Sequence, residues 1–348
     1  MRIWTPSRYP LTISVATALL VGCGGGNVAT PPGTTQSGSK TDRIFPSGPQ
    51  MASGGDLIYA DTEGGGVVIA TYPDLKLVGT FDINYATDTF GVCSDASGNV
   101  FITGLNYPSG FINEYSHGGT SPIAILSETR YYTPYDCSYD PITGNLAVAD
   151  YCRACGNYGE GGVSIYANEQ GSPTRYTDPN MEFPQYLGYD GKGNVFVGGQ
   201  NTQTGQTVFA ELPKGSSTFA NITLPDGVCC AGRIQWDGKH IAIEERFVHA
   251  IYRIAVTGSD GSVVGTTRLK ERSHYRMGES WLYPKGSEVI VPEANNDRAL
   301  GAYAYPRGGK AVKTNKYLRF GFMFSATISV GSKNAAEPDF GADAAAKQ

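Results

Sequence analysis

Cys93-Ser-Asp-Ala-Ser-Gly-Asn-Val-Phe-Ile-Thr-Gly104 is the stretch that decides the fold, because versions of it return at a nearly constant interval. It contains the end of an apolar strand, an Asp, a tight Gly-Asn turn and a second apolar strand. From Asp95 onward, the spacings between successive corresponding positions are 45, 50, 47 and 46 residues. Those positions are Asp140, Asp190, Asp237 and, in degraded form, Tyr283. This period indicates a repeated supersecondary unit.

Each repeat predicts four strands, which is one blade of a β-propeller. The segment 56–81 supplies only the second, third and fourth strands of a blade, whereas 322–330 is a spare strand at the other end. An open ring would expose two apolar sheets, so closure is favoured. We therefore predict an all-β, six-bladed propeller over residues 55–331, closed by the C-terminal strand, which completes the first blade.

The composition supports strands and excludes one class of partner. The chain has 348 residues, including 46 Gly and 22 Tyr, which suits short strands joined by tight turns. Its net charge is −5 and only 17% of its residues are charged. A nucleic-acid partner would require a basic stripe to neutralise phosphates, so none is expected.

The first 23 residues predict an export signal. Arg2 and Arg8 precede an apolar run at 11–21, which is too short to span a bilayer. The run ends in Leu20-Val-Gly-Cys23, which resembles the bacterial lipobox. That resemblance implies lipidation of Cys23 and a protein anchored to the cell envelope, at the outer membrane if the cell has two. The alternative is an ordinary signal peptide with a chance cysteine.

Two further segments are too polar or too simple to pack a core. Residues 24–54, rich in Gly, Thr, Ser and Pro, predict a flexible tether between the lipid and the propeller. Residues 332–348, which are rich in Ala, predict a disordered tail. Apart from the lipid anchor, no contact with a membrane is expected, and we expect a monomer.

The repeat resembles those of NHL-type propellers and of the gluconolactonase and senescence-marker-protein (SMP-30) family. The resemblance rests on three features of the repeat: the inner strand ending in Asp, the Gly-Asn turn and the following apolar strand. It extends over residues 56–330. It implies a six-bladed propeller, but such repeats serve enzymes, sensors and scaffolds alike.

We name as the loop-rich face the side that carries the second-to-third loops and the blade-to-blade connections. It includes segments rich in aromatic and ionisable residues, at 130–135, 150–158, 229–230, 244–249, 272–276 and 293–298. Binding sites usually lie on such loops. We expect a protein or small molecule to bind here. The opposite side, the turn face, carries tight turns with a structural purpose.

The inner strands begin at the channel mouth on this face. Asp136, Gln185, Arg233 and Glu279 fall at these starts, where they could bind a metal or a polar ligand. Alternatively, they satisfy one another and some water. No cofactor is expected, although a divalent metal stays possible.

The family resemblance suggests two kinds of enzyme. Lactone hydrolases of the gluconolactonase type hold a divalent ion with a Glu of the first blade's inner strand, but segment 322–330 contains no carboxylate. Lyases of the streptogramin-inactivating type use a channel His and an acid, for which His274 and Glu279 are the candidates. We favour a non-catalytic binding module over both enzymes and over a scaffold for envelope assembly.

The cysteines predict structural disulfides, because an exported chain meets an oxidising compartment. Cys137 is expected to pair with Cys152 or Cys155, whereas Cys93 is expected to be a buried thiol. Cys229 and Cys230 could form a vicinal bridge or pair elsewhere. A zinc half-site or a redox pair at 152–155 are the alternatives.

Overall fold

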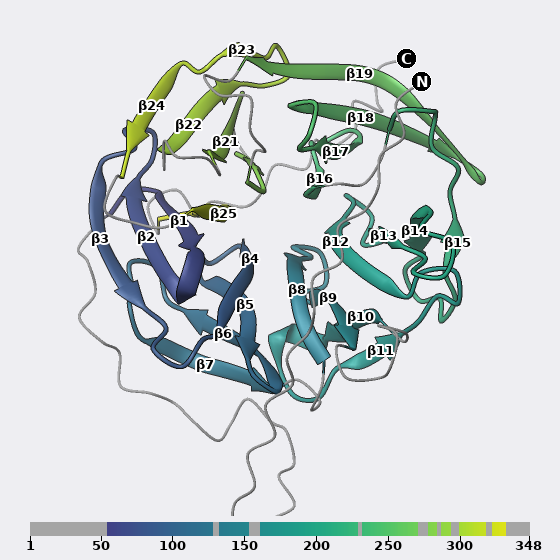
Figure 1. Ribbon diagram of the computed structural model, residues 1–348, viewed down its shortest axis with the longest axis horizontal. Coiled ribbons are helices and arrows are strands. Elements are labelled where there is room, and N and C mark those ends of the chain that lie inside the picture. The colour runs from purple at the N-terminus through teal and green to yellow at the C-terminus, as the bar shows by residue number, and fades with distance from the viewer. Residues whose placement is uncertain are drawn as a thin grey trace, which may run out of the picture. The chain divides into compact units, whose positions relative to one another are not determined.

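A computed structural model describes residues 54–127, 132–152, 161–228, 232–270, 278–283, 287–293, 299–317 and 322–331. This part of the chain forms six sheets arranged as a six-bladed β-propeller, so the predicted fold is confirmed (Figure 1). Within these residues, no helix combines the length and the hydropathy that crossing a membrane would take. The predicted signal at 1–23, nearly all of the tether at 24–54 and the tail at 332–348 lie outside the described residues.

Each blade has its first strand at the channel and its last strand at the rim (Figure 1). Blade 1 consists of β25 (Met323–Ser329), β1 (Leu57–Thr62), β2 (Gly66–Thr71) and β3 (Leu77–Asp82). Blade 2 consists of β4 (Asp88–Ser94), β5 (Val100–Asn106), β6 (Ser109–Tyr115) and β7 (Pro122–Ser127). Blade 3 consists of β8 (Tyr132–Tyr139), β9 (Leu146–Cys152), β10 (Gly162–Tyr166) and β11 (Thr174–Tyr176).

The remaining blades follow in chain order. Blade 4 consists of β12 (Phe183–Tyr189), β13 (Val195–Gln200), β14 (Thr207–Leu212) and β15 (Ala220–Asn221). Blade 5 consists of β16 (Ile234–Trp236), β17 (Ile241–Glu245), β18 (Ala250–Thr257) and β19 (Asp260–Lys270), with β23 (Gly309–Lys310) paired parallel to β19. Blade 6 consists of β20 (Trp281–Leu282), β21 (Glu288–Glu293), β22 (Ala299–Ala304) and β24 (Lys313–Lys316). Two 3-10 turns, η2 (Glu63–Gly65) and η3 (Ala167–Glu169), complete the described elements.

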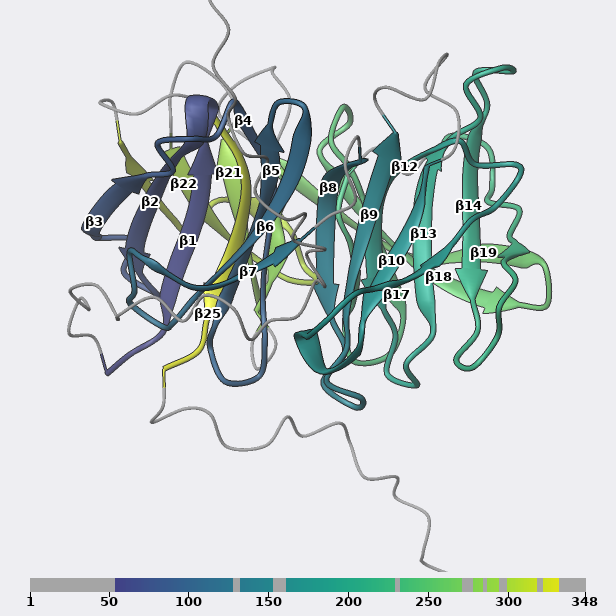
Figure 2. The ribbon, with the colours of Figure 1, turned by 90° about the horizontal axis from the view of Figure 1, so that it is seen from below.

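The C-terminal strand closes the ring as predicted. In antiparallel register with β1, β25 places Ile328 opposite Ile58 and Ala326 opposite Ala60. The strands of each blade run between the loop-rich face and the turn face, as the edge-on view shows (Figure 2). The segments that meet in blade 1 are therefore the first and the last strands of the propeller.

The repeated Asp fixes the turn that follows it. Asp95 accepts hydrogen bonds from the backbone N–H of Asn99 at 2.7 Å and from its side-chain Nδ2 at 2.8 Å. Gly98 has a φ of 87°, which favours glycine. Asp190 and Asn194 form the same pair of bonds in blade 4. The recurring Asp and Gly-Asn pair is thus a local device that reverses the chain at the turn face.

The hydrophobic core lies between blades rather than within one centre. At the junction of blades 6 and 1, Ile58, Ala326 and Ile328 pack with Ile290 and Leu300. Comparable clusters fill the other five junctions. Each blade therefore depends on both of its neighbours for the burial of its faces.

One predicted disulfide is wrong, because Cys137 pairs with Cys93. Within blade 3, Cys137 lies opposite Val148 rather than opposite Cys152, so the hairpin does not bring those two sulfurs together. Cys93 and Cys137 instead occupy the adjacent inner strands β4 and β8, and their bond links blades 2 and 3. The expectation that Cys93 is a thiol is also wrong. Cys152 is disulfide-bonded as well.

Three other cysteine predictions cannot be compared with the fold. Cys155, Cys229 and Cys230 lie outside the described residues.

Candidate functional site

A buried charge network fills the loop-rich end of the channel. Arg233, just before β16, places Nη1 3.2 Å from Oδ1 of Asp136 in β8 and Nη2 3.0 Å from Oε2 of Glu279. The same Nη2 donates to the Ser325 hydroxyl in β25 at 2.5 Å. Three of the four predicted channel-mouth residues are thus brought together, and the guanidinium connects blades 5, 3, 6 and 1. We call this set the channel network.

Two more carboxyl groups belong to the channel network. Sequence reasoning missed Asp61, and it placed Glu244 in segment 244–249 of the loop-rich face but not at the channel. Asp61 is the second-to-last residue of β1 and accepts the Ser325 N–H at 2.7 Å. Glu244 in β17 accepts the N–H groups of Arg233 at 3.2 Å and of Ser280 at 3.0 Å. Both acids follow apolar residues near the end of a second strand, which returns to the mouth where the inner strands start. That position in the repeat is the signal that could have found them.

Burial shifts the ionisation of these acids. Desolvation raises the pKa of Asp61 and that of Glu244 to about 7 each, against the lowering effect of their hydrogen bonds. It also raises the pKa of Asp136 and that of Glu279. For Glu279, the neighbouring Asp136 carboxylate adds to the rise. At neutral pH the channel network therefore holds fewer negative charges than its carboxyl groups would carry in water.

The channel network does not suit a divalent metal ion. Where the carboxylates of Asp136 and Glu279 converge, the position is taken by the Arg233 guanidinium, a permanent cation. A divalent ion there would meet this charge at short range. Strand β25, which is the first blade's inner strand, contributes a hydroxyl from Ser325 and no carboxylate. The residues present thus match an internal ion-pair cluster, the alternative to ligand binding stated above.

Gln185, the fourth predicted channel-mouth residue, is not part of this arrangement. Gln185 is half-buried at an irregularity in the pairing of β12 with β13 and makes no hydrogen bond to the channel network among the described residues. His274 lies outside the described residues.

We expect the free energy of unfolding to fall as the pH rises from about 5 to 8. Asp61 and Glu244 keep their protons up to about pH 7 when folded but ionise near their ordinary pKa values of 3.8 and 4.5 when unfolded. The folded state therefore binds more protons in this window, and the loss is complete above about pH 7. A fall of about 1–3 kcal/mol for each group is expected in urea titrations.

Asp61→Asn provides the matched test, because the amide oxygen can still accept the Ser325 N–H. This variant should show a smaller fall, whereas Asp226→Asn, at an exposed position, should match the wild type. If the free energy of unfolding of Asp61→Asn falls with pH as steeply as that of the wild type, the raised pKa of Asp61 is contradicted.

An open depression of about 580 Å³ lies on the loop-rich face between blades 3 and 4. Its described lining residues come from the start of β8, the second-to-third loops of blades 3 and 4 and the connection between these blades. They are Tyr132, Gly161, Thr177, Asp178, Pro179, Met181, Glu182 and Gln203. We call this site the interblade depression. Sequence reasoning predicted the face and, in segment 130–135, included Tyr132, but it did not predict the other lining residues.

A tight turn shapes one wall of the interblade depression. In Asp178-Pro-Asn-Met181 the Met181 N–H donates to the Asp178 carbonyl at 3.0 Å, and Oδ1 of Asp178 accepts the Asn180 N–H at 2.9 Å. Asp and Pro are favoured at the first two positions of such a turn. The Asp178 side chain is only 7% exposed, and its Oδ2 has no hydrogen-bond partner among the described residues.

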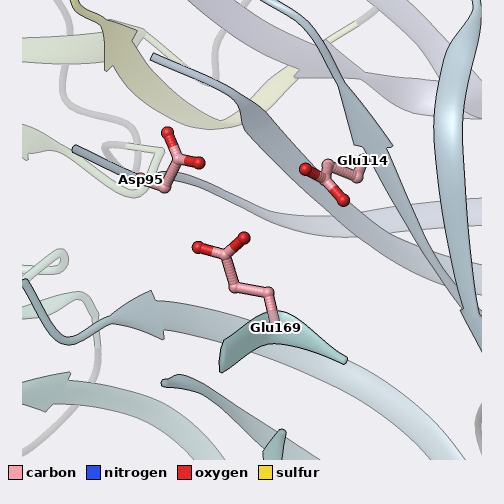
Figure 3. Close-up of side chains that lie close together, drawn as sticks. All are labelled: Asp95, Glu114 and Glu169. Carbon is pink, nitrogen blue, oxygen red and sulfur yellow. The ribbon is translucent and has the colours of Figure 1, made fainter. Parts of the chain in front are cut away.

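A second acidic cluster lies on the turn face. Asp95, Glu114 and Glu169 point toward one another at the junction of blades 2 and 3, with carboxylate oxygens within 4.8 Å of one another (Figure 3). Burial raises the pKa of Asp95, although Asn99 hydrogen bonds oppose the shift.

No protein-family model and no curated protein matches the chain. Among solved structures, it is similar to a chain in the crystal structure of a nidogen/laminin complex, with a TM-score of 0.62 and 12% identity over 80% of this chain and 99% of that one. It is also similar to a protein of unknown function from Bacteroides caccae, with a TM-score of 0.58 and 11% identity over 79% of this chain and 99% of that one. At these identities the likeness shows the fold alone, and that fold is a β-propeller.

Proposed function

We propose that this protein is an exported, lipid-anchored propeller that binds a ligand or partner at the interblade depression without converting it. Leu20-Val-Gly-Cys23 supports the anchor, and the polar segment 24–54 supports a tether that holds the propeller off the membrane. The likeness to other propellers is one of fold and favours no particular chemistry.

The observation that carries the proposal is the Asp178 carboxyl group. A buried polar atom without a partner costs free energy, of about 1–3 kcal/mol or more if charged, so such atoms mark sites where a partner is missing. Oδ2 of Asp178 is such an atom, and it belongs to a residue that lines an open depression. A ligand that donates a hydrogen bond there would recover this cost.

The channel network supports binding over catalysis. A general acid or base must come within hydrogen-bond reach of the substrate. Asp136, Arg233 and Glu279 are at most 2% exposed, and they are paired with one another. Burial and mutual interaction explain the shifted pKa values of these groups. Ion-pair networks with a purely structural role also shift pKa values in this way.

Exposed apolar side chains on the loop-rich face add contact surface. Tyr107, between β5 and β6, is 72% exposed, and Phe247 and Val248, between β17 and β18, are 60% and 53% exposed. Each lies in a second-to-third loop, so all three belong to the loop-rich face. Aromatic side chains in such positions are enriched where proteins bind partners.

The test is retention of components from a cell-envelope extract by the immobilised protein, followed by mass spectrometry. Gln203→Trp should fill the interblade depression and abolish retention, whereas Lys239→Trp on the turn face should leave it unchanged. The retained compounds should keep their masses. Loss of retention only with Lys239→Trp, or conversion of a retained compound, would overturn the proposal. In the full chain, Cys23→Ser should release the protein from the membrane fraction.

A further inference from the structure

We propose that the interblade depression binds a primary alkylammonium group of the kind that a lysine side chain carries. This inference rests on the proposed function and names the chemical class of the ligand. Its starting point is the charge of the lining, which includes the carboxyl groups of Asp178 and Glu182 and, among the described lining residues, no Lys or Arg.

Glu182 supplies a persistent negative charge at the rim. Its carboxylate accepts hydrogen bonds from the Thr202 N–H at 3.0 Å, from the Thr202 hydroxyl and from Nε2 of Gln203 at 2.7 Å. These bonds lower the pKa of Glu182, the Thr202 hydroxyl contributing most. Glu182 is therefore ionised at neutral pH.

The nearby cation does not neutralise the lining. Arg175 forms an ion pair with the buried Asp150, and its guanidinium carbon lies 3.8 Å from the centre of the Tyr132 ring. Arg175 is thus engaged with Asp150 and with the Tyr132 ring, both in blade 3. The lining keeps its negative character, which favours a cationic ligand.

The geometry of Asp178 favours an ammonium over the other cations. Oδ1 is taken by the Asn180 N–H, whereas Oδ2 is buried and has no hydrogen-bond partner among the described residues, so Oδ2 is the oxygen left for a ligand. A guanidinium pairs best with both oxygens of a carboxylate, whereas an ammonium is a compact charge that one oxygen can accept. A calcium ion would need six or more oxygen ligands.

The rest of the lining suits an aliphatic stem. Tyr132, Pro179 and Met181 contribute apolar surface beside the two acids. A volume of about 580 Å³ is within the usual range for small-molecule sites and accommodates the side chain together with its flanking peptide groups. Lysine methylenes pack on apolar surface while the ammonium reaches the acids.

The experiment is a titration of the protein with N-acetyl-lysine methylamide and, as the neutral counterpart, N-acetyl-norleucine methylamide, monitored by chemical-shift changes. We expect a Kd of about 1 mM for the lysine probe and at least about tenfold weaker binding of the norleucine probe. Asp178→Asn should raise the Kd of the lysine probe at least about tenfold, and Glu182→Gln should raise this Kd by a smaller factor. Asp226→Asn, a substitution at an exposed position that does not line the depression, should change nothing.

Each outcome has a defined meaning. Equal binding of the two probes, or unchanged binding to a folded Asp178→Asn variant, would overturn the ammonium assignment. If n-butylammonium binds as tightly as the lysine probe, the ligand is a free amine. If n-butylammonium binds more weakly than the lysine probe, the ligand is a lysine within a polypeptide. Both results support the ammonium assignment. If envelope components are retained in a Gln203-dependent way while the lysine probe fails, only the ligand class is wrong. If the Gln203→Trp variant retains envelope components as well as the wild type does, the proposed function itself is wrong.

Discussion

Arg233→Met should lower the free energy of unfolding by about 3–5 kcal/mol, because it leaves buried carboxylates without their cation. The guanidinium is 2% exposed and reaches Asp136, Glu279 and Ser325, which belong to three blades other than its own. Methionine follows the arginine side chain as far as the Nε position but supplies neither charge nor donors. Urea denaturation followed by tryptophan fluorescence measures the loss.

Two comparisons separate this effect from a general sensitivity to substitution. Arg307→Met changes an exposed arginine and should cost less than about 0.5 kcal/mol. The loss in Arg233→Met should also be larger at pH 8 than at pH 5, since the uncompensated acids can take up protons at the lower pH. A loss below about 1 kcal/mol at pH 8 would show that the channel network is not held by Arg233.

Ending the chain at residue 321 should abolish the cooperative fold, because it removes β25. Met323, Ala326 and Ile328 are fully buried and pack at the junction of blades 6 and 1. Truncating a large buried apolar side chain costs about 2–5 kcal/mol, and the strand also carries the backbone ladder to β1. The summed loss of stability approaches the free energy of unfolding of a whole domain, which is about 5–15 kcal/mol. Circular dichroism melting and limited proteolysis report the outcome.

The matched control ends at residue 331 and keeps β25 together with the Gly331 N–H, which donates to Asp56 at 2.9 Å. This chain should melt cooperatively. A synthetic peptide of residues 322–331, added to the shorter chain, should restore protection of blade 1 from protease. Cooperative melting of the shorter chain without the peptide would contradict the closure that the register implies.

The repeat made the architecture predictable. Asp95 and Asn99 act within one turn, so their meaning is visible in a few consecutive residues. The absence of an inner strand before β1 and the spare strand at β25 then required a closed ring of six blades. Counting strands was sufficient because each blade is a local unit with a fixed order of strands.

The site was less predictable, because its contacts cross between blades. Arg233 and Glu279 were found because inner strands start at one mouth, but Asp61 and Glu244 arrive on second strands that end there. The Cys93–Cys137 bond joins neighbouring blades, whereas the prediction considered one hairpin. Such proximity depends on how adjacent sheets face each other, which the spacing along the chain does not encode.

The closure by β25 also sets an order of events during biosynthesis. Ribosomes make β1 first and β25 last, and about 260 residues separate the two strands. At about 5–20 residues per second, the inner edge of the first sheet is therefore without its partner strand for roughly 10–50 s. Throughout this interval β1 presents unpaired backbone groups, to which another nascent chain could add a strand. The N-terminal sheet is therefore the segment that a chaperone would need to shield until translation ends.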